Sequence, residues 1–466
     1  MSTPVKNTVG YSSSNRSKFD KYTASILSTV KWNDGGGASV KLTYSFPWTN
    51  GQAYATNPYG TYGGLGEFNA AYPLSLVEQN AVKSALAAWS SVGGLTFTKV
   101  QDKINVVGDL RFAETTVPGV GENGHAYYPG ARPDSGDVWL NRNSWHTGSE
   151  TIQKGSYDYY TLLHETGHAL GLKHPHDNPN PKMPDVYDTY SFTIMSYNAF
   201  ENSGVIWASI YPTTPMYYDL KAIWALYGAK AHNPGNNTYT YSDTARYWQT
   251  LDDSGGVDTL VYNGTAGATI NLNPGNWSTL GLPITFGSGP DQAATVMMGP
   301  RTIIENAYGS EGNDVILGNK ANNKLFGRGG DDELRGGKGN DILDGGPSKA
   351  GEPVDGDTLW GGPGADKFYF KDKSFFDTVV DFNPVQDLIY ISRSAFGLDL
   401  PVGRLPGTAF FRGPAANDPD DRLIYNPANG QLVRDMNGSD PGGDPSFFIV
   451  FSNKPALTAA DIFIIA

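Results

Sequence analysis

The sequence predicts an α+β first domain with a small mixed sheet and a site-bearing helix, followed by an all-β second domain built as a parallel β-roll or sandwich. Three observations support this prediction. Two segments of the first half space apolar residues at helical period, short β-rich runs lie between them, and the second half repeats glycine and aspartate every nine residues. We therefore expect a tail or short propeptide over 1–18, a first domain over 19–243 and a second over 244–466.

The composition limits the possible partners. The chain has 47 acidic and 34 basic residues and a formal charge of −13, which argues against binding of nucleic acid or anionic lipid and favours cations. Cysteine is absent, so disulfides, thiolate metal sites and a cysteine nucleophile are excluded. Residues 1–10 lack a secretory signal and no apolar run could span a membrane. Taken alone, these two features predict a cytoplasmic protein without membrane insertion.

Local signals place three helices and a sheet in the first domain. A capping box, Ser75 with Glu78, opens an amphipathic helix that ends near residue 89. A second helix ends near residue 172 with Ser156 or Asp158 as its N-cap, and a third covers about 219–227. Short β-rich runs between the first two helices predict the sheet: 95–100, 104–113, 125–129 and 137–141.

Three of the seven histidines occur in one pattern, His164-Glu165-x-x-His168-x-x-Gly171-x-x-His174. Positions four apart on a helix are separated by about 40° and about 6 Å, so His164 and His168 can bind one ion. On a continuing helix His174 would point to the wrong side, and Gly171 tolerates the positive φ of the turn that must precede it. Three imidazoles leave a position on Zn²⁺ open for water, which is typical of a catalytic site.

Glu165 projects about 100° further round the same helix, close enough to reach that water without binding the metal, as a general base requires. The alternative is a helix whose histidines only pack or face solvent, and the full pattern makes it much the weaker interpretation. The pattern does not include His176, which is expected to be solvated or to lie behind the ligands.

The motif resembles that of the metzincin metalloproteases, in which a methionine turn follows the third histidine. Residues 191–197, Ser-Phe-Thr-Ile-Met-Ser-Tyr, are similar to this turn. The resemblance implies that Met195 lies beneath the metal. It also implies that Tyr197, as in the serralysin branch, is a further zinc ligand that swings away to stabilise the transition state. Without the resemblance, Met195 would be ordinary core filling and Tyr197 a surface aromatic.

The resemblance implies a zinc endopeptidase that acts on protein or peptide substrates. Zinc would polarise the peptide carbonyl, and Glu165 would take a proton from the bound water and pass it to the leaving amine. Substrate main chain is expected to add to the edge strand at Ala126, Tyr127 and Tyr128, by resemblance and because extended peptides bind to free strand edges. An ordinary edge strand is the alternative for each of these three residues.

From Gly309 the chain divides into units of nine residues that fit GGxGxDxUx. In each unit the glycine-rich half should turn and one apolar residue, such as Ile316, should point inward. Carboxylates recur at the sixth position and would repel one another unless a hard cation lay between them, which favours several Ca²⁺ ions. Asn323 takes this place in the second unit and offers an oxygen without charge. A flexible linker is the alternative, but it would give the regular apolar residues no role.

Two parts of this region depart from the repeat. The insertion 348–356 interrupts the fifth unit and puts its calcium site in doubt, and the upstream segment 253–258, with Glu305, is similar to serralysin calcium positions. The calcium ligands expected from the repeats and from the resemblance are Asp253, Gly255, Gly256, Asp258, Glu305, Ser310, Gly312, Asp314, Asn319, Ala321, Asn323, Arg328, Gly330, Asp332, Gly337, Gly339, Asp341, Gly346, Asp357, Gly362, Gly364, Asp366 and Asp387.

The resemblance also bears on location. Repeats of this kind accompany one-step export from Gram-negative bacteria by type I secretion machinery, and residues 461–466 are similar to an uncleaved C-terminal secretion signal, with an edge strand as the alternative. The resemblance therefore implies an extracellular monomer, with a proteinaceous inhibitor as a further partner, and overrides the cytoplasmic prediction. A noncatalytic calcium-binding module such as an adhesin is the competing function, but Glu165 beside all three histidines favours the enzyme.

Overall fold

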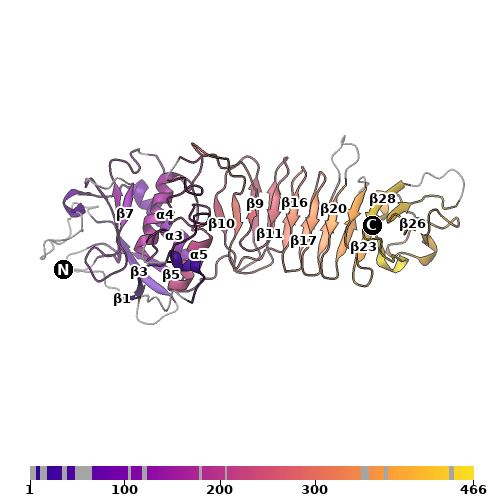
Figure 1. Ribbon diagram of the computed structural model, residues 1–466, viewed down its shortest axis with the longest axis horizontal. Coiled ribbons are helices and arrows are strands. Elements are labelled where there is room, and N and C mark those ends of the chain that lie inside the picture. Colours follow the sequence, from indigo (N-terminus) through magenta and orange to yellow (C-terminus); the bar gives the residue numbers. More distant parts are fainter. Residues whose placement is uncertain are drawn as a thin grey trace. The chain divides into compact units, whose positions relative to one another are not determined.

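The computed structural model describes residues 7–10, 18–33, 39–47, 66–102, 107–117, 123–148, 150–177, 181–204, 207–347, 356–371, 376–439 and 446–466 (Figure 1). The chain forms two compact units. The first comprises 1–232, 247–252 and 284–292, and the second comprises 233–246, 253–283 and 293–466. The chain thus returns twice to the first unit after leaving it, a crossing that local sequence periodicity does not reveal.

The first unit contains the predicted small mixed sheet. Its strand order is β5-β3-β6-β8-β7, with β4 paired to β6. Strands β5, β3, β6 and β8 run parallel, whereas β7 is antiparallel to β8 and forms one edge. The bounds are β3 Val40–Ser45, β4 Ala71–Tyr72, β5 Leu95–Lys99, β6 Leu110–Thr115, β7 Gly124–Ala126 and β8 Asp137–Asn141. Residues 104–106 of one predicted run lie outside the described residues.

The three predicted helices are present in this unit. Helix α3 (Leu76–Val92) begins at the expected capping box, in which the Glu78 backbone N–H donates to Ser75 Oγ and the Ser75 N–H donates to the Glu78 carboxylate. Helix α4 (Tyr157–Ala169) has Ser156 as its N-cap, which decides between the two candidates. The remaining helical elements are α2 Lys21–Ser25, η1 Glu67–Ala70 and α5 Tyr217–Tyr227.

Contacts between these elements fix the position of α4. The Trp89 indole of α3 donates to the Leu163 carbonyl of α4 at 3.2 Å, and the Trp32 indole donates to the Ala169 carbonyl at 2.8 Å. Both indoles are fully buried. Strand β1 (Asn7–Gly10) pairs antiparallel with β2 (Val30–Asn33), although the sequence predicted no element before residue 18.

The second unit contains two nine-stranded sheets, visible in Figure 1 as successive short arrows. Consecutive nine-residue units alternate between the sheets, so residues 18 apart are neighbours: Ile316 lies beside Leu334 in one sheet and Leu325 beside Leu343 in the other. These four side chains are fully buried, which confirms the predicted inward positions. Each buried side chain of this size stabilises the fold by about 1.5–3 kcal/mol.

The first of these sheets has the order β24-β29-β23-β21-β19-β17-β15-β11-β9, and the second has the order β12-β16-β18-β20-β22-β28-β27-β26-β25. The last strand, β29, pairs with both β23 and β24 and is therefore not an edge strand. The strand bounds in this unit are β9 Thr238–Ser242, β11 Thr259–Asn263, β12 Thr269–Asn271, β13 Trp277–Ser278, β14 Val296–Met298, β15 Asn306–Tyr308, β16 Val315–Leu317, β17 Lys324–Phe326, β18 Glu333–Arg335, β19 Ile342–Asp344, β20 Thr358–Trp360, β21 Lys367–Phe370, β22 Asp377–Val379, β23 Leu388–Ser392, β24 Gly403–Arg404, β25 Phe410–Arg412, β26 Leu423–Asn426, β27 Gln431–Arg434, β28 Ser446–Phe451 and β29 Ile462–Ile465.

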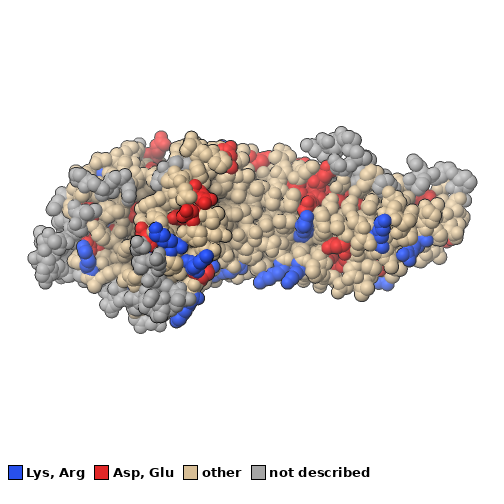
Figure 2. Space-filling view, in the orientation of Figure 1, with Lys and Arg blue, Asp and Glu red and all other residues tan. Residues whose placement is uncertain are grey.

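Much of the negative charge is inside the second unit. Aspartates at the sixth position of the repeats are buried, among them Asp332, Asp341 and Asp366. The face seen in Figure 2 accordingly shows scattered acidic and basic side chains. Within the described ranges, no helix has the length and apolar character needed to cross a membrane.

Candidate metal centre

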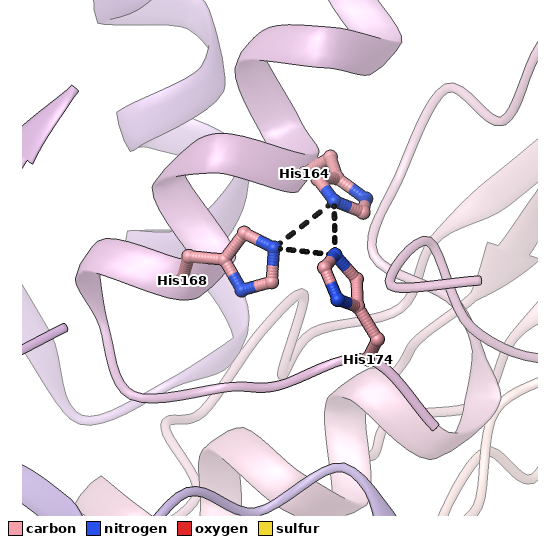
Figure 3. Close-up of side chains that lie close together, drawn as sticks. All are labelled: His164, His168 and His174. Carbon is pink, nitrogen blue, oxygen red and sulfur yellow. Dashed lines mark hydrogen bonds between the residues drawn. The ribbon is translucent and has the colours of Figure 1, made fainter. Parts of the chain in front are cut away.

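The three histidines of the eleven-residue pattern converge on one point (Figure 3). His164 and His168 lie one turn apart on α4, and the chain then turns at Gly171, whose φ of +100° only glycine adopts easily. A Cβ at Gly171 would also lie 2.6 Å from the Val30 carbonyl oxygen. The Nε2 atoms are 3.1 Å apart for His164 and His168, 2.9 Å for His168 and His174, and 3.3 Å for His164 and His174.

The other ring nitrogen of each histidine has its own acceptor. His164 Nδ1 donates to the Ile194 carbonyl (2.7 Å), and His168 Nδ1 donates to the Leu172 carbonyl (2.8 Å). His174 Nδ1 donates to the Asp177 carboxylate (2.9 Å). These contacts place the proton on Nδ1 and leave three Nε2 lone pairs facing one another. Such lone pairs repel unless a cation lies between them. Zn–N bonds of about 2.0–2.1 Å in tetrahedral geometry require nitrogens about 3.3 Å apart, so the residues fit zinc.

Burial keeps these rings neutral, which is the form that binds a metal. It lowers the pKa of His164 to about 4, and burial together with the neighbouring His164 lowers the pKa of His174 to about 2. The pKa of His168 also falls well below its usual value because the ring is buried. The triad is therefore ready for a cation at neutral pH.

The turn beneath the triad is held by buried polar contacts. Met195 is fully buried, and a Cβ at Gly167 of α4 would lie 2.6 Å from its sulfur, so glycine is needed there. Asp219 of α5 accepts hydrogen bonds from the Ile194 N–H (2.8 Å) and the Thr193 hydroxyl (2.6 Å). Burial raises the pKa of Asp219 to about 7. Through its hydrogen bond from the Ile194 N–H, Asp219 fixes the residue whose carbonyl accepts from His164 and orients that ring.

A cleft of about 130 Å³ opens beside the triad. Its lining residues are Gly124, His125, Ala126, Tyr128, Glu165, His168, His174 and Tyr197. The Tyr197 ring centroid lies 4.4 Å from that of His174. Glu165 is buried next to β7, since a Cβ at Gly124 would lie 3.3 Å from its Cγ. The structure thus brings Glu165, Tyr197, His168 and His174 to one cleft, and the Nε2 atom of the remaining predicted ligand, His164, lies 3.1 Å from that of His168.

Strand β7 presents only part of the predicted substrate-binding set to the cleft. Ala126 and Tyr128 line it, whereas the Tyr127 hydroxyl points away and donates to Glu67. The Tyr127 main chain is also engaged, because its N–H donates to the Asp137 carbonyl and its carbonyl accepts from the Gly136 N–H. In an antiparallel pair the inward and outward main-chain groups alternate. Gly124 and Ala126 therefore direct theirs toward the free edge.

His176 lies outside the triad but close to it. Its ring stacks on that of His174, with centroids 5.3 Å apart, and its Nδ1 lies 3.1 Å from the Asp188 carboxylate. This contact raises the pKa of His176. Sequence reasoning missed the polar partners Asp177 and Asp219, for which the only local signal was the N3 position of Asp219 in α5.

The repeat turns form two rows of carboxylates. In one row Asp332 Oδ1 accepts from the Asp314 N–H (2.7 Å) and Asp357 Oδ1 from the Asp332 N–H (2.8 Å). Asp357 therefore joins the row despite the insertion, of which residues 348–355 lie outside the described residues. In turn the Asp357 N–H donates to Asp377, a member of the row that the sequence analysis did not include.

The second row follows the same rule. Asp366 Oδ1 accepts from the Asp341 N–H (2.8 Å) and Asp387 Oδ1 from the Asp366 N–H (2.9 Å). Within the described part of the chain, the Oδ2 atoms of Asp332, Asp341 and Asp366 are buried without a hydrogen-bond partner. Burial raises the pKa of these three carboxyls to about 9, 6 and 7 respectively. Orphaned, buried carboxylate oxygens fit Ca²⁺, a hard cation that takes oxygen ligands.

The other predicted calcium ligands lie in the same turns. Gly255, Gly256, Gly330, Gly337, Gly339, Gly346 and Gly362 have positive φ, as does Arg328 at +84°. Upstream, Glu305 accepts from the Asp258 N–H (2.8 Å), and Asp253 accepts from the Gly255 N–H (2.7 Å). The remaining members are Ser310, Gly312, Asn319, Ala321, Asn323 and Gly364, of which Asn319 and Asn323 make different contacts, described below.

Comparison with known proteins agrees with both halves of this description. Residues 70–196 match the family described as Matrixin, and residues 308–346 and 355–371 match the RTX calcium-binding nonapeptide repeat (4 copies). These matches and the histidine triad confirm the expected fold class and the expected zinc and calcium cofactors.

Three relatives are similar to this chain in sequence. Serralysin C of Dickeya chrysanthemi is 33% identical over 314 residues, which cover 62% of this chain and 61% of the relative. Metallopeptidase AprA of Pseudomonas marginalis is 30% identical over 333 residues, covering 64% and 65%. Serralysin of Photorhabdus luminescens is 30% identical over 265 residues, covering 52% of each chain. The chain thus matches less than two thirds of the length of these curated relatives.

Proposed function

From a matrixin domain joined to RTX calcium-binding repeats, we propose that this chain is a calcium-dependent zinc endopeptidase of the serralysin type. The observation that carries the proposal is the convergence of three histidine Nε2 atoms beside a cleft that also contains Glu165 and Tyr197. The Nδ1 atom of each of these rings is already hydrogen-bonded to its own acceptor. Zinc bound by His164, His168 and His174 would supply a Lewis acid that polarises the scissile carbonyl and makes water more acidic.

The chain's own side chains would then move and stabilise charge. Glu165 is the general base: its carboxylate takes a proton from water in the cleft and passes it to the leaving amine. Tyr197 would be a further ligand before substrate binds, and its hydroxyl would donate a hydrogen bond to the substrate oxygen as negative charge develops there. The short distance between the Tyr197 and His174 rings supports this role.

The substrate is an extended segment of a protein or peptide. It adds as a further strand to β7, whose outward main-chain groups belong to Gly124 and Ala126, and Tyr128 contacts its side chains. The position of β7 at the edge of the described sheet supports this mode, because β7 pairs with β8 along one side and the substrate would pair along the other.

Calcium would stabilise the second unit by neutralising the two rows of buried carboxylates. We place the protein outside the cell. It is exported by type I secretion machinery, with residues 461–466 as the signal. It acts as a monomer that a proteinaceous inhibitor can block. The RTX match supports this placement.

The zinc- and calcium-loaded chain is expected to cleave casein and unstructured peptides. Removal of zinc with a chelator should abolish cleavage, and added zinc should restore it. Cleavage that continues at the full rate without zinc would refute the proposal, as would a fully loaded chain that cleaves neither substrate.

A further inference from the structure

A buried carboxylate is hydrogen-bonded to two side chains of the segment that would bind the substrate. Glu67 of η1 is fully buried, and its Oε1 lies 2.7 Å from His125 Nε2 and 2.6 Å from the Tyr127 hydroxyl. Although burial acts to raise it, the hydrogen bonds from these two side chains lower the pKa of Glu67 to about 2. The carboxylate is therefore charged, and charge-assisted hydrogen bonds are the stronger kind.

The opposite face of the same strand rests on the catalytic helix. Side chains alternate along a strand, so His125 and Tyr127 face Glu67 whereas Gly124 and Ala126 face the other way. On that side Gly124 fits closely against Glu165 of α4. Strand β7 has only three residues and, among the described residues, one strand neighbour, and such short pairings are marginal without further support.

Resting on the proposed function, we propose that Glu67 is a positioning residue. Through its hydrogen bonds to His125 and Tyr127, Glu67 fixes the position and register of β7 beside the metal centre. It thereby determines how tightly an extended peptide main chain binds to β7. The Glu67 carboxylate does not line the cleft, and therefore it acts on the substrate only through the strand.

The test compares a ligand that needs the strand with one that does not. The variants are Glu67→Gln, Glu67→Ala and Tyr127→Phe, each zinc-loaded, and the matched control is Glu114→Gln. Glu114 is another buried glutamate of the first unit, but it lies in β6 and its carboxylate binds Arg142 (2.6 Å). Two inhibitors are titrated against each protein: a peptide hydroxamate long enough to pair with β7, and acetohydroxamate.

For Glu67→Ala we expect peptide hydroxamate to bind about tenfold more weakly and KM for a peptide to rise similarly, while kcat, zinc content and acetohydroxamate binding stay within about twofold. Glu67→Gln and Tyr127→Phe should show smaller losses, because one acceptor or one donor remains, and Glu114→Gln none. Equal weakening of both inhibitors, or unchanged peptide hydroxamate binding, would overturn the proposal. Because binding is measured without turnover, a chain that bound both inhibitors but cleaved nothing would refute the proposed function alone.

A separate observation concerns the second carboxylate row. In this row the backbone N–H of one turn donates to the sixth-position side-chain oxygen of the next turn. Asn323 departs from this pattern, because no backbone N–H of the Glu305 turn donates to it. Its Nδ2 donates instead to the Glu305 carbonyl (3.0 Å) and the Ile304 carbonyl (3.2 Å). Asn319 Nδ2 donates to the same Ile304 carbonyl (2.8 Å) and to the Leu272 carbonyl (3.2 Å).

The oxygens of these two amides are also engaged inside their own turn. Asn323 Oδ1 accepts from the Asn319 N–H, and Asn319 Oδ1 accepts from the Ala321 N–H, both at 2.8 Å. A calcium ion needs oxygen lone pairs directed at it, whereas here amide hydrogens point at the facing carbonyls. The residues at this junction do not fit calcium.

We infer that the Asn319 and Asn323 amides replace a calcium ion at this junction, contrary to the expectation that Asn319, Ala321 and Asn323 are ligands. The row is then divided into two groups of ion sites, one around Asp258 and Glu305 and one from Asp341 onward.

Calcium bound per folded chain, measured by elemental analysis, separates the two possibilities. Asn323→Ala and the exposed control Asn322→Ala should retain the wild-type number of ions, whereas Asp341→Asn should lose at least one. Loss of an ion in Asn323→Ala alone would overturn the inference. If Asn323→Ala does not fold, an anomalous difference map of wild-type crystals grown in calcium decides. A peak within about 2.6 Å of Asn323 Oδ1 contradicts the inference, and its absence supports it.

Discussion

Replacing Asp219 by asparagine should make the first unit less sensitive to pH without loosening the turn beneath the histidines. The Asp219 carboxylate accepts from the backbone N–H groups of Ile194 and Met216, both at 2.8 Å, and from the Thr193 hydroxyl. An asparagine oxygen can accept both N–H groups, and its amide can donate to the Thr193 oxygen. The pattern of contacts therefore survives the substitution.

The magnitude follows from the pKa of Asp219, which burial raises from its ordinary value of 3.8 to about 7. Between these values the folded chain binds more protons than the unfolded chain, so its stability falls as pH rises. The slope is at most about 1.4 kcal/mol per pH unit. Asparagine does not titrate, so the variant should gain about 2 kcal/mol relative to wild type between about pH 5.5 and about pH 7.

Urea unfolding of both proteins, loaded equally with zinc and calcium, measures this difference at each pH. Asp219→Ala is the control, because it leaves buried N–H groups without an acceptor and should cost about 2–5 kcal/mol throughout the range. A free-energy difference between wild type and Asp219→Asn that did not change with pH would refute the reasoning.

Four further outcomes are expected. Glu165→Ala should retain zinc but lose about 10²–10⁴-fold in kcat, as measured by peptide cleavage and metal analysis, and near-wild-type rates would exclude the base role. Tyr197→Phe should lower kcat by about 10²-fold with little change in unfolding free energy, and an unchanged kcat would rule out charge stabilisation. Asp177→Asn should weaken zinc binding about 10–100-fold in a chelator competition, since it orients His174, and equal affinity would argue against that role. Calcium removal should unfold residues after about 244, and circular dichroism indifferent to calcium would rule out ion-dependent folding.

Features with a local cause could be predicted from the sequence. The capping box at Ser75 and the spacing of His164 and His168 act within a few residues, and the structure has them as expected. The glycine turn at Gly171 belongs to the same class. The inward leucines of the repeats also follow from a short period.

Features that depend on distant partners could not. Glu67 meets His125 across 58 residues, and Asp219 meets Ile194 across 25. The side to which Tyr127 points depends on the register of β7 against β8, and a strand read alone does not fix that register. Nor does the repeat pattern distinguish an asparagine that accepts from one that donates, because only the facing carbonyls decide it.

The carboxylate rows have a direction. Along both rows an aspartate donates its backbone N–H to a carboxylate that lies 18 or more residues later in the chain, as Asp341 does to Asp366 and Asp366 to Asp387. The carboxylate acceptors of these N–H groups are therefore synthesised after the coil that uses them, although the same coils also donate to carbonyls of earlier coils, as the Glu333 N–H does to Asp314. A chain still growing on the ribosome lacks the acceptors for its newest coils. The carboxylate row of a newly made coil is therefore completed only when the next coil of the same row has been synthesised.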